Sequence, residues 1–343
     1  EVVAGHAAAF RVQRGQVSAI TTGAPVPAGA DAIVMIEDTE LVERRDGGGA
    51  EKTVVIKTSP LKGQHIRRKG VDFLEGDVVL QKGMRVSSAV VGVAAAAGHT
   101  SLPVFRKNTV TVFSTGDEVV SPGEVPNGSQ VFDSNRVMMH TALRKNFGSA
   151  LDIRDGGIVL DKVESVKAAI LEACCTSDVV ITSGGVSMGG FDHVKSVFAE
   201  LGTLHIGRVR LKPGKPFTFA TAMIGGRKKF LFGLPGNPAS THVTCQLFVI
   251  PVLHWLLGDG AFKLSQVRAK VGFPIPLDPN RPEYHRASLV FDMQTGVYVA
   301  SSVGRQASSS LLSCSAADAL LEVPQGDGEL PSGTMLDAYL VSM

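Results

Sequence analysis

The sequence has few cysteines, and their spacing suggests neither a metal site nor a disulfide framework. Four occur in 343 residues: Cys174 and Cys175 are adjacent, while Cys245 and Cys314 stand alone. This spacing contains no C-x-x-C pair. We therefore expect reduced, buried thiols and a cytoplasmic location.

Long apolar runs and an excess of one charge are also lacking. No apolar run reaches the ~18 residues of a membrane span, and no basic region followed by an apolar stretch opens the chain. The 34 basic and 32 acidic residues give a net charge of +2, which provides no general basic field for nucleic acid. We expect a soluble protein without a membrane span or a nucleic-acid partner, and a local anion site is compatible with this balance.

The length of the chain predicts two or three domains, because single hydrophobic cores stop growing near roughly 250–300 residues. Residues 17–43 alternate short β-branched runs with turn signals, and three consecutive glycines at 47–49 indicate a hairpin tip. We expect a small β-rich domain over residues 1–61.

Residues 62–105 differ in character and predict a connecting domain. An arginine-rich strand and the Gly-Asp turns at 70–77 are expected first. An alanine- and valine-rich helix ending at Gly98 follows.

Strands and helices then alternate over residues 106–258, which predicts a mainly parallel sheet covered by helices. Ligands bind such sheets at the carboxyl ends of the strands. The expected strands lie at 109–113, up to 159 and at 179–182, and the expected helices lie at 134–147, from 161 and from 192.

Helical periodicity fades after Gly258, and residues 259–343 predict a C-terminal β-barrel or sandwich. The expected strands lie near 266–273, 284–291, 296–303 and 334–341. The predicted fold class is therefore multidomain α/β, with a central α/β sheet domain, a small β-rich domain, a connecting domain and a C-terminal barrel-like β domain.

A loop with four glycines follows the strand at 179–182, in the segment DVVITSGGVSMGGFDHVKSVF. Glycines let the backbone approach a ligand closely, and the start of the helix that follows favours an anion. Asp192 precedes this helix, so it is either an N-cap or a magnesium ligand facing a phosphate. The spacing alone favours the cap.

Ser187 lies in the same loop, within a G-x-S-x-G pattern at residues 185–189. Asp278 and His285 follow it in the chain order of a serine hydrolase, which keeps that class as an alternative to an ordinary loop hydroxyl. The match is weak, because an elbow serine directly follows its strand, whereas three residues intervene here.

Two further loops could bind an anion. Lys212 and Lys215 flank a proline-glycine turn between two strands, where both ammonium groups could converge on one oxyanion, although loop lysines are usually only solvated. In KFLFGLPGNPAST, Asn237 is the expected N-cap and Pro238 the first helical residue of a long apolar helix. Ser240 then lies beside unpaired backbone amides, and a well-capped helix alone would also explain this segment.

Carboxylates follow other strands of the predicted sheet. The segment STGDEVV provides Asp117 and Glu118, and FDSNR provides Asp133 before a helix. Each could be a turn or cap residue. Together, carboxylates at several strand ends could instead hold a hydrated magnesium ion against phosphate oxygens.

Five ordered motifs resemble the molybdenum insertase (molybdopterin molybdenumtransferase) family, which includes the E domains of the plant enzyme and of gephyrin. They are T-G-D-E at 115–118, D-S-N at 133–135, T-S-G-G-V-S-M-G-x-x-D at 182–192, K-P-G-K-P at 212–216 and L-P-G-N-P-x-S at 234–240. Segments 21–34, 66–73 and 281–287 also look like family segments, so the resemblance covers nearly the whole chain. Five motifs in order are specific, whereas a lone glycine loop is not.

The resemblance implies a reaction with adenylylated molybdopterin and molybdate as substrates. The family cleaves the phosphoanhydride in a step that needs a divalent metal, here expected to be Mg²⁺. It delivers molybdenum to the dithiolene sulfurs and releases AMP.

The resemblance also implies site residues, motif by motif. The catalytic set would be Asp192, Glu118, Asp161 and Ser187, and the metal ligands would be Asp192 and Asp117. The residues around the pterin nucleotide would be Thr115, Gly116, Asp133, Ser134, Ser183, Gly184 and Gly185, with Ser187 in the same cradle. The residues around molybdate would be Lys212, Lys215, Pro216, Ser240, Arg281 and Ser308.

Partners follow from the same resemblance: a homodimer, and a molybdopterin adenylyltransferase as an attached domain or separate protein. The gephyrin branch also suggests a scaffold with a receptor or cytoskeletal partner. Family members begin with a helical segment and an aspartate-glycine-tyrosine stretch, which we expect ahead of Glu1. Two local departures are Gly190 with Phe191, where charged residues are common, and Ser310, where some relatives have arginine.

Overall fold

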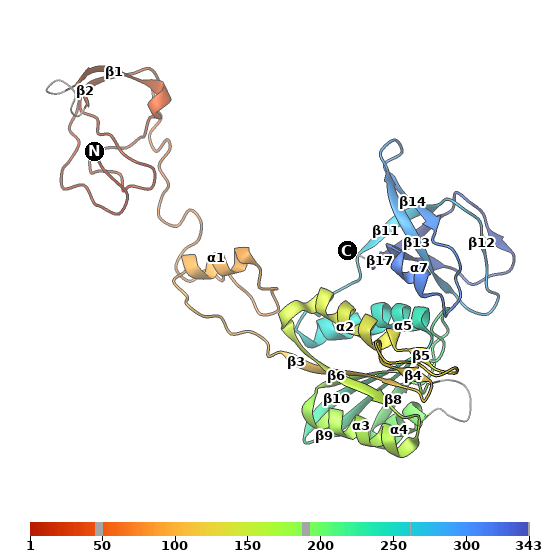
Figure 1. Ribbon diagram of the computed structural model, residues 1–343. Helices are drawn as coiled ribbons and strands as arrows, with labels where there is room; N and C mark the ends of the chain where they lie inside the picture. The colour runs from red at the N-terminus through yellow and green to blue at the C-terminus, as the bar shows by residue number, and fades with distance from the viewer. Residues whose placement is uncertain (45–50, 187–192, 261, 342–343) are drawn as a thin grey trace. The chain divides into compact units, whose positions relative to one another are not determined.

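The computed structural model describes residues 1–44, 51–186, 193–260 and 262–341. These form two compact units, 1–81 and 82–343 (Figure 1). The finer boundaries at residues 61, 105 and 258 stay a prediction. None of the described helices is both long and apolar enough to cross a bilayer.

The N-terminal unit contains one regular β-pair. A 3-10 turn, Ile36–Asp38, leads into strand β1 (Thr39–Arg44), which pairs antiparallel with β2 (Glu51–Ile56). The expected hairpin tip at 47–49 lies outside the described residues. Elsewhere in this unit, strand pairing is limited among the described residues to single bridges from Val2 to Ile20 and from Arg11 to Ala28.

The expected arginine-rich strand in this unit is wrong. Described residues 62–80 contain turns and no strand. Arg67, Arg68 and Lys69 are all exposed, so the segment has no alternate face to bury. Gly70, at φ +83°, helps the chain turn so that the Val71 amide donates to the Arg68 carbonyl at 3.2 Å.

The second unit begins near the expected alanine-rich helix, α1 (Ser88–Ala96). The Ser87 hydroxyl caps it by accepting from the Val90 amide at 3.3 Å. Gly98 follows at φ +83°, a left-handed conformation that favours glycine and ends the helix.

The central sheet has six strands, four of them adjacent and parallel. In spatial order they are β6 (Leu151–Val159), β3 (Asn108–Thr115), β7 (Val179–Ser183), β10 (Arg227–Leu234), β9 (Thr218–Ile224) and β8 (Thr203–Ile206). The first four are parallel, while β9 runs antiparallel to both β10 and β8. This confirms the mainly parallel sheet.

Helices cover both faces of the sheet, as Figure 1 shows. On one face lie α2 (Ser134–Phe147) and a continuous segment of α5 (Pro238–Thr244), a π-helical turn (Cys245–Val249) and α6 (Ile250–Leu256); on the other lie α3 (Val163–Thr176) and α4 (His193–Leu201). Helix α3 starts two residues later than expected. The π turn precedes Pro251, which cannot donate a backbone hydrogen bond to the turn before it.

Two hydrophobic cores follow from the alternation of side chains along β7. Val179 and Ile181 are fully buried against the α2, α5 and α6 face, whereas Val180 is fully buried against the α3 and α4 face. Burying each such side chain stabilises the fold by about 1.5–3 kcal/mol. An apolar run without polar alternation therefore marks a strand covered on both faces.

The thiols are mostly buried, as expected. Cys174, Cys245 and Cys314 are buried, and burial raises the pKa of Cys245 to about 12. The expectation is wrong for Cys175, which is exposed. Adjacent residues on a helix point in different directions, so only Cys174 of this pair faces the core.

The C-terminal domain is a closed five-stranded barrel, which decides between the barrel and the sandwich. Its strands, in spatial order, are β11 (Gln266–Val271), β14 (Val297–Ser302), β13 (Glu283–Asp292), β15 (Ala319–Val323) and β17 (Met335–Leu340). The sequence did not predict β15, which follows the short helix α7 (Leu311–Ser315) without a clear turn signal. Each strand places one fully buried alanine in the core: Ala269, Ala300, Ala287, Ala319 and Ala338. Small side chains let so narrow a barrel close.

Shorter pieces complete the second unit. They are β4 (Val119–Val120) paired with β5 (Val131–Phe132), β12 (Ile275–Pro276) paired with β16 (Glu329–Leu330), and a 3-10 turn at Gly148–Ala150.

Asp178, just before β7, fixes the chain at the start of β3. Its carboxylate accepts two hydrogen bonds from Arg106, at 2.6 and 2.7 Å, and one from the Thr109 amide at 3.0 Å. The Arg106 hydrogen bond is the main cause that lowers the pKa of Asp178. A carboxyl with a lowered pKa stabilises the folded state above its unfolded pKa, and this contribution is lost as the pH falls through the folded value.

We therefore expect Asp178→Asn to lower the free energy of unfolding at pH 7, because charge-assisted hydrogen bonds are lost. The loss should be only about 1–2 kcal/mol, because Arg106 is largely exposed and solvent screens its charge. Urea unfolding followed by the fluorescence of Trp255, the single tryptophan, measures this change. The difference from the unsubstituted protein should shrink below about pH 4. Asp152→Asn, which removes an exposed partner of Arg154, is the control, and an equal loss there would contradict the prediction.

Candidate functional site

The ends of the four parallel strands bring the predicted loops to one edge of the sheet. The Gly116 amide donates to the Val159 carbonyl at 3.2 Å, which joins the end of β3 to the end of β6. The Gly184 amide donates to the Leu234 carbonyl at 3.1 Å, which joins β7 to β10. The segments that begin at Thr115, Asp161, Ser183 and Leu234 therefore share one edge.

The loop after β7 approaches β3 so closely that only glycine fits. Gly184 has a φ of +90°, and a Cβ there would lie 2.4 Å from the carbonyl oxygen of Thr115. At Gly185 a Cβ would lie 2.7 Å from the Val194 side chain. This bare backbone next to the start of α4 is suited to contact with a phosphate group.

Asn135 connects this edge to the P-G-N-P turn. Its amide nitrogen donates to the Ser183 hydroxyl and to the Gly236 carbonyl, both at 2.7 Å. The sequence interpretation did not single out Asn135, although the D-S-N motif contains it. Its partners lie in other motifs, so the sequence gives no signal of the pairing.

Asp133 has the contacts of a helix cap. It accepts from the Arg136 amide at 3.1 Å, from the Ser114 hydroxyl at 2.9 Å and from the Arg136 side chain at 2.9 Å. The residue is buried, and both carboxylate oxygens have internal partners. These contacts support the cap interpretation. Ser134 opens the helix and is half-buried, and its cofactor-binding role stays a prediction.

Three carboxylates gather beyond β3 and β6. The Asp161 amide donates to Asp117 at 3.0 Å, and the Glu118 carboxylate lies over Gly116, where a Cβ would be 2.6 Å from it. Burial raises the pKa of Asp161, the positive charge of His193 opposes this, and the charges of Asp117 and Glu118 raise it further. One Asp161 oxygen is buried without a hydrogen-bond partner among the described residues.

This cluster suits a cation that also contacts a ligand. Mg²⁺ in phosphate-binding sites commonly takes one or two carboxylates together with phosphate oxygens and water. Among the described residues, no group of three acidic, histidine or cysteine side chains is arranged to enclose an ion. The three carboxylates alone therefore do not enclose an ion, and a metal-binding role for them stays a prediction. Asp192 and Ser187 lie outside the described residues.

The K-P-G-K loop is fixed between the barrel and α5. The Lys212 amide donates to Pro282 at 3.0 Å, and the Tyr284 amide donates to the Lys212 carbonyl at 2.8 Å. Gly214, at φ +119°, packs so tightly that a Cβ would lie 2.6 Å from the Thr244 side chain of α5. Both lysines are therefore held on packed backbone, and Pro216 follows them in the same loop.

Ser308 lies against the start of α5, the helix that contains Ser240. The Ala239 amide donates to the Ser308 carbonyl at 2.9 Å, and the Asn237 side chain donates to the Ser308 hydroxyl at 3.2 Å. Asn237 occupies the predicted cap position, yet its side chain makes no cap hydrogen bond. Ser240 is buried in the first turn of the same helix.

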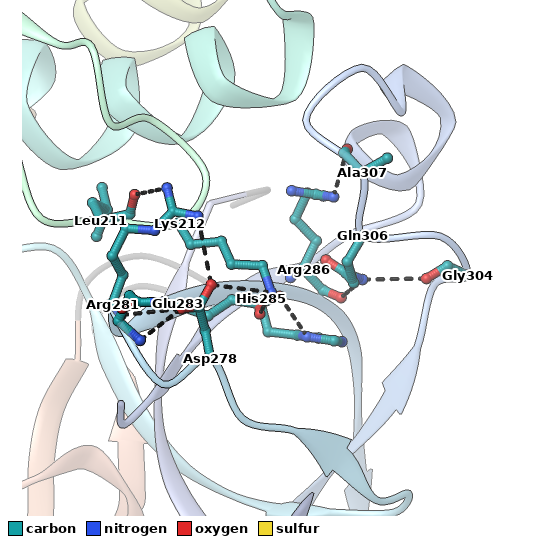
Figure 2. Close-up of polar contacts among 11 residues, drawn as sticks. Leu211, Lys212, Asp278, Arg281, Glu283, His285, Arg286, Gly304, Gln306 and Ala307 are labelled. Carbon is teal, nitrogen blue, oxygen red and sulfur yellow. Dashed lines mark hydrogen bonds and ion pairs between the residues drawn. The ribbon is translucent and has the colours of Figure 1, made fainter. Parts of the chain in front are cut away.

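Carboxylates order the neighbouring cations, as Figure 2 shows. The Lys212 ammonium lies 2.8 Å from Glu283 and 3.8 Å from Asp278, and the Arg281 guanidinium lies 3.5 Å from Asp278. Burial alone would raise the pKa of Glu283, but hydrogen bonds from His285 and Lys212 hold it below its usual value. Lys215 is half-buried and has no ion pair among the described residues.

The geometry does not support a hydrolase arrangement. His285 Nδ1 lies 3.0 Å from Glu283, while Asp278 contacts Lys212 and Arg281. Asp278 and His285 thus have different partners, and no Asp–His pair of a triad forms between them.

A cavity of about 570 Å³ lies beside the helices α2, α5 and α7. Asp133 and Ser134 line one part of it, but the lysines and the carboxylates at 117, 118 and 161 are not among its described lining residues. His242 also lines it, and burial with the nearby charge of Arg286 lowers the pKa of this histidine to about 4. We do not place the candidate site there.

Three family models match the chain in order. "MoeA N-terminal region (domain I and II)" matches residues 2–98, "Probable molybdopterin binding domain" matches 111–255, and "MoeA C-terminal region (domain IV)" matches 268–341. Together they follow the order of the described β-rich, α/β and barrel parts.

Curated relatives agree. Gephyrin of Dictyostelium discoideum is 39% identical over 94% of this chain and 48% of its own length. The molybdenum cofactor synthesis protein cinnamon of Drosophila melanogaster is 37% identical over 91% of this chain and 50% of its own. The chain thus spans about half the length of these two relatives. The molybdopterin molybdenumtransferase of Nostoc sp. is 33% identical over 97% of this chain and 74% of its own length.

Solved structures show the same architecture. The molybdopterin biosynthesis moea protein from Pyrococcus horikosii has a TM-score of 0.76 and 29% identity, and the match covers 100% of this chain and 80% of that one. The resemblance inferred from the five motifs is confirmed, as is the fold class. This chain belongs to the molybdopterin molybdenumtransferase family.

Proposed function

We propose that this protein inserts molybdate into adenylylated molybdopterin, with cleavage of the phosphoanhydride and release of AMP. One observation carries the proposal: the turn at 234–240 touches both an edge suited to a nucleotide and a cluster suited to an oxyanion. Gly236 of this turn accepts from Asn135 at the strand ends, and the Ser240 carbonyl oxygen would lie 4.0 Å from a Cβ on Gly214 of the lysine loop. Two anionic substrates could therefore bind on either side of one rigid turn.

The strand ends supply the nucleotide side. Backbone at Thr115, Gly116 and residues 183–185 would cradle the pterin nucleotide, and Asp117 with Asp161 would hold Mg²⁺ together with Asp192. Bound Mg²⁺ would neutralise charge that develops on the phosphoanhydride oxygens. Glu118, whose carboxylate lies over Gly116, would be available to the same ion.

The lysine loop supplies the oxyanion side. Lys212, Lys215 and Arg281 would provide charged donors, and the hydroxyls of Ser240 and Ser308 would provide neutral ones. Charge-assisted hydrogen bonds are roughly twice as strong as neutral ones, so the cations would dominate the affinity for molybdate.

We also propose that the protein works as a cytoplasmic homodimer. A molybdopterin adenylyltransferase, attached or separate, would supply its adenylylated substrate. This chain covers 48% of gephyrin and 50% of cinnamon, and the remaining length of these relatives leaves room for an attached domain of this kind.

AMP release from adenylylated molybdopterin tests the function. We expect release to need both molybdate and Mg²⁺ and to yield active cofactor. A folded protein that releases no AMP under these conditions would overturn the proposal and favour a scaffold that kept the fold without the chemistry.

Asp161→Asn tests the metal side. We expect the Mg²⁺ concentration for half-maximal AMP release to rise at least about tenfold, because a carboxylate ligand is lost. The midpoint of urea unfolding should stay the same or rise, since the raised pKa means that the ionised Asp161 opposes folding at neutral pH.

The control for this variant is Glu164→Gln, which changes an exposed carboxylate in the first turn of α3. It should leave the Mg²⁺ dependence unchanged. If Asp161→Asn and Glu164→Gln behaved alike, Asp161 would have no part in metal binding.

Lys215→Ala tests the oxyanion side. We expect the half-saturating molybdate concentration to rise about tenfold or more, because the variant removes a cation that has no ion pair with another described residue. The affinity for adenylylated molybdopterin should change little. Lys228→Ala, at an exposed position near the start of β10, is the matched control, and unchanged molybdate dependence in both variants would exclude Lys215 from the site.

A further inference from the structure

The free edge of β13 organises the oxyanion side. Strand β13 pairs with β15 over residues 283–287 but with β14 only over 287–292. The first half of β13 therefore has no described strand on its β14 side. Lys212 takes this place as a single parallel bridge to Glu283, through the two backbone hydrogen bonds described above.

Glu283 is buried on this edge, and both of its carboxylate oxygens have partners. Its residue exposure is 4%; Oε2 lies 2.8 Å from Lys212 Nζ, and Oε1 lies 3.0 Å from His285 Nδ1. An ionised carboxylate can only accept hydrogen bonds, so the His285 proton must lie on Nδ1. Figure 2 shows the three side chains in a row.

The contact with Glu283 leaves some N–H donors of the Lys212 ammonium group available for a ligand. Lys212 has three N–H donors, and Glu283 accepts one of them. Asp278, at 3.8 Å from Nζ, is beyond hydrogen-bond distance and is already the partner of Arg281. The remaining Lys212 donors can therefore be directed at an oxyanion.

The charges of the four groups cancel. Lys212 and Arg281 contribute two positive charges, and Glu283 and Asp278 contribute two negative ones. Lys215 then supplies the positive charge of the proposed site that no described ion pair compensates, and the direction of the Lys212 and Arg281 N–H donors must supply much of the remaining affinity. A displaced N–H donor should therefore weaken anion binding markedly at such a site.

We propose that Glu283, itself oriented by His285, is a positioning residue that fixes the Lys212 ammonium for a tetrahedral oxyanion. This inference rests on the proposed function, because it deepens the description of the molybdate side. Without Glu283, the nearest carboxylate to Lys212 is Asp278. The lysine would compete there with Arg281, and both cations would leave their places.

The conservative variant separates position from charge. In Glu283→Gln, the amide oxygen can still accept from Lys212, and the amide nitrogen can donate to His285 after a change of tautomer. In Glu283→Ala, both contacts are lost. Likewise, His285→Asn keeps a donor near the Nδ1 position, whereas His285→Phe removes it.

The experiment is calorimetric titration of the full chain with sodium molybdate, alongside titration with adenylylated molybdopterin. We expect Glu283→Ala to raise the molybdate Kd about tenfold, or about 1.4 kcal/mol, and Glu283→Gln to stay within about threefold of the unsubstituted protein. His285→Phe should weaken molybdate binding and His285→Asn should not. The Kd for adenylylated molybdopterin should change by less than about twofold.

Glu322→Ala is the control, because Glu322 lies on the neighbouring strand β15 and binds the Tyr339 hydroxyl instead. Tighter molybdate binding in both Glu283 variants would show that Glu283 competes with the anion and would overturn the proposal. If the Glu283 variants bound molybdate and adenylylated molybdopterin equally weakly and had a lower Tm, Glu283 would have only a structural role. Absence of molybdate binding by the unsubstituted protein would instead contradict the proposed function itself.

Discussion

The candidate site depends first on the parallel pairing of β6, β3, β7 and β10. Parallel strands end at the same edge, so loops from distant parts of the chain meet there without any direct attraction between them. The close approach of Gly184 to the Thr115 carbonyl then sets how near the loops come. Asn135 carries this arrangement to the P-G-N-P turn by bonding both Ser183 and Gly236.

The two sides of the site are built by different physical means. At the strand ends, the charges of Asp117 and Glu118 raise the pKa of Asp161, and one buried Asp161 oxygen lacks a hydrogen-bond partner among the described residues. Beside the barrel, opposite charges already compensate each other through Glu283 and Asp278. The first side therefore contains like charges that oppose one another, whereas the second is ordered by ion pairs without a ligand.

Local patterns predicted the elements well where chemistry and periodicity agreed. Helix α2 has the predicted bounds because Asp133 caps it and its apolar residues share one face. The strand expected around Arg67 failed because a basic run has no apolar face to bury. Strand β15 was missed because its apolar run follows α7 without a turn signal.

The site was only partly readable from sequence for a related reason. Motifs predicted which loops lie at the strand ends, since glycine and capping residues act within a few positions, while the anion-binding role of these loops stays a prediction. The pairing of Lys212 with Glu283 and of Asn135 with Gly236 joins residues far apart in the chain. No local spacing records such pairs, because tertiary packing alone creates them.

The ring of buried alanines in the barrel also limits how this domain can diverge. A larger side chain at Ala287 or Ala300 would push neighbouring strands apart, so these positions can change only in concert with those across the core. The loops at the barrel's rim, including the one that carries Ser308, face no such restriction. Substitutions at the rim can therefore change the surface of these loops, while the buried alanines preserve the barrel that carries them.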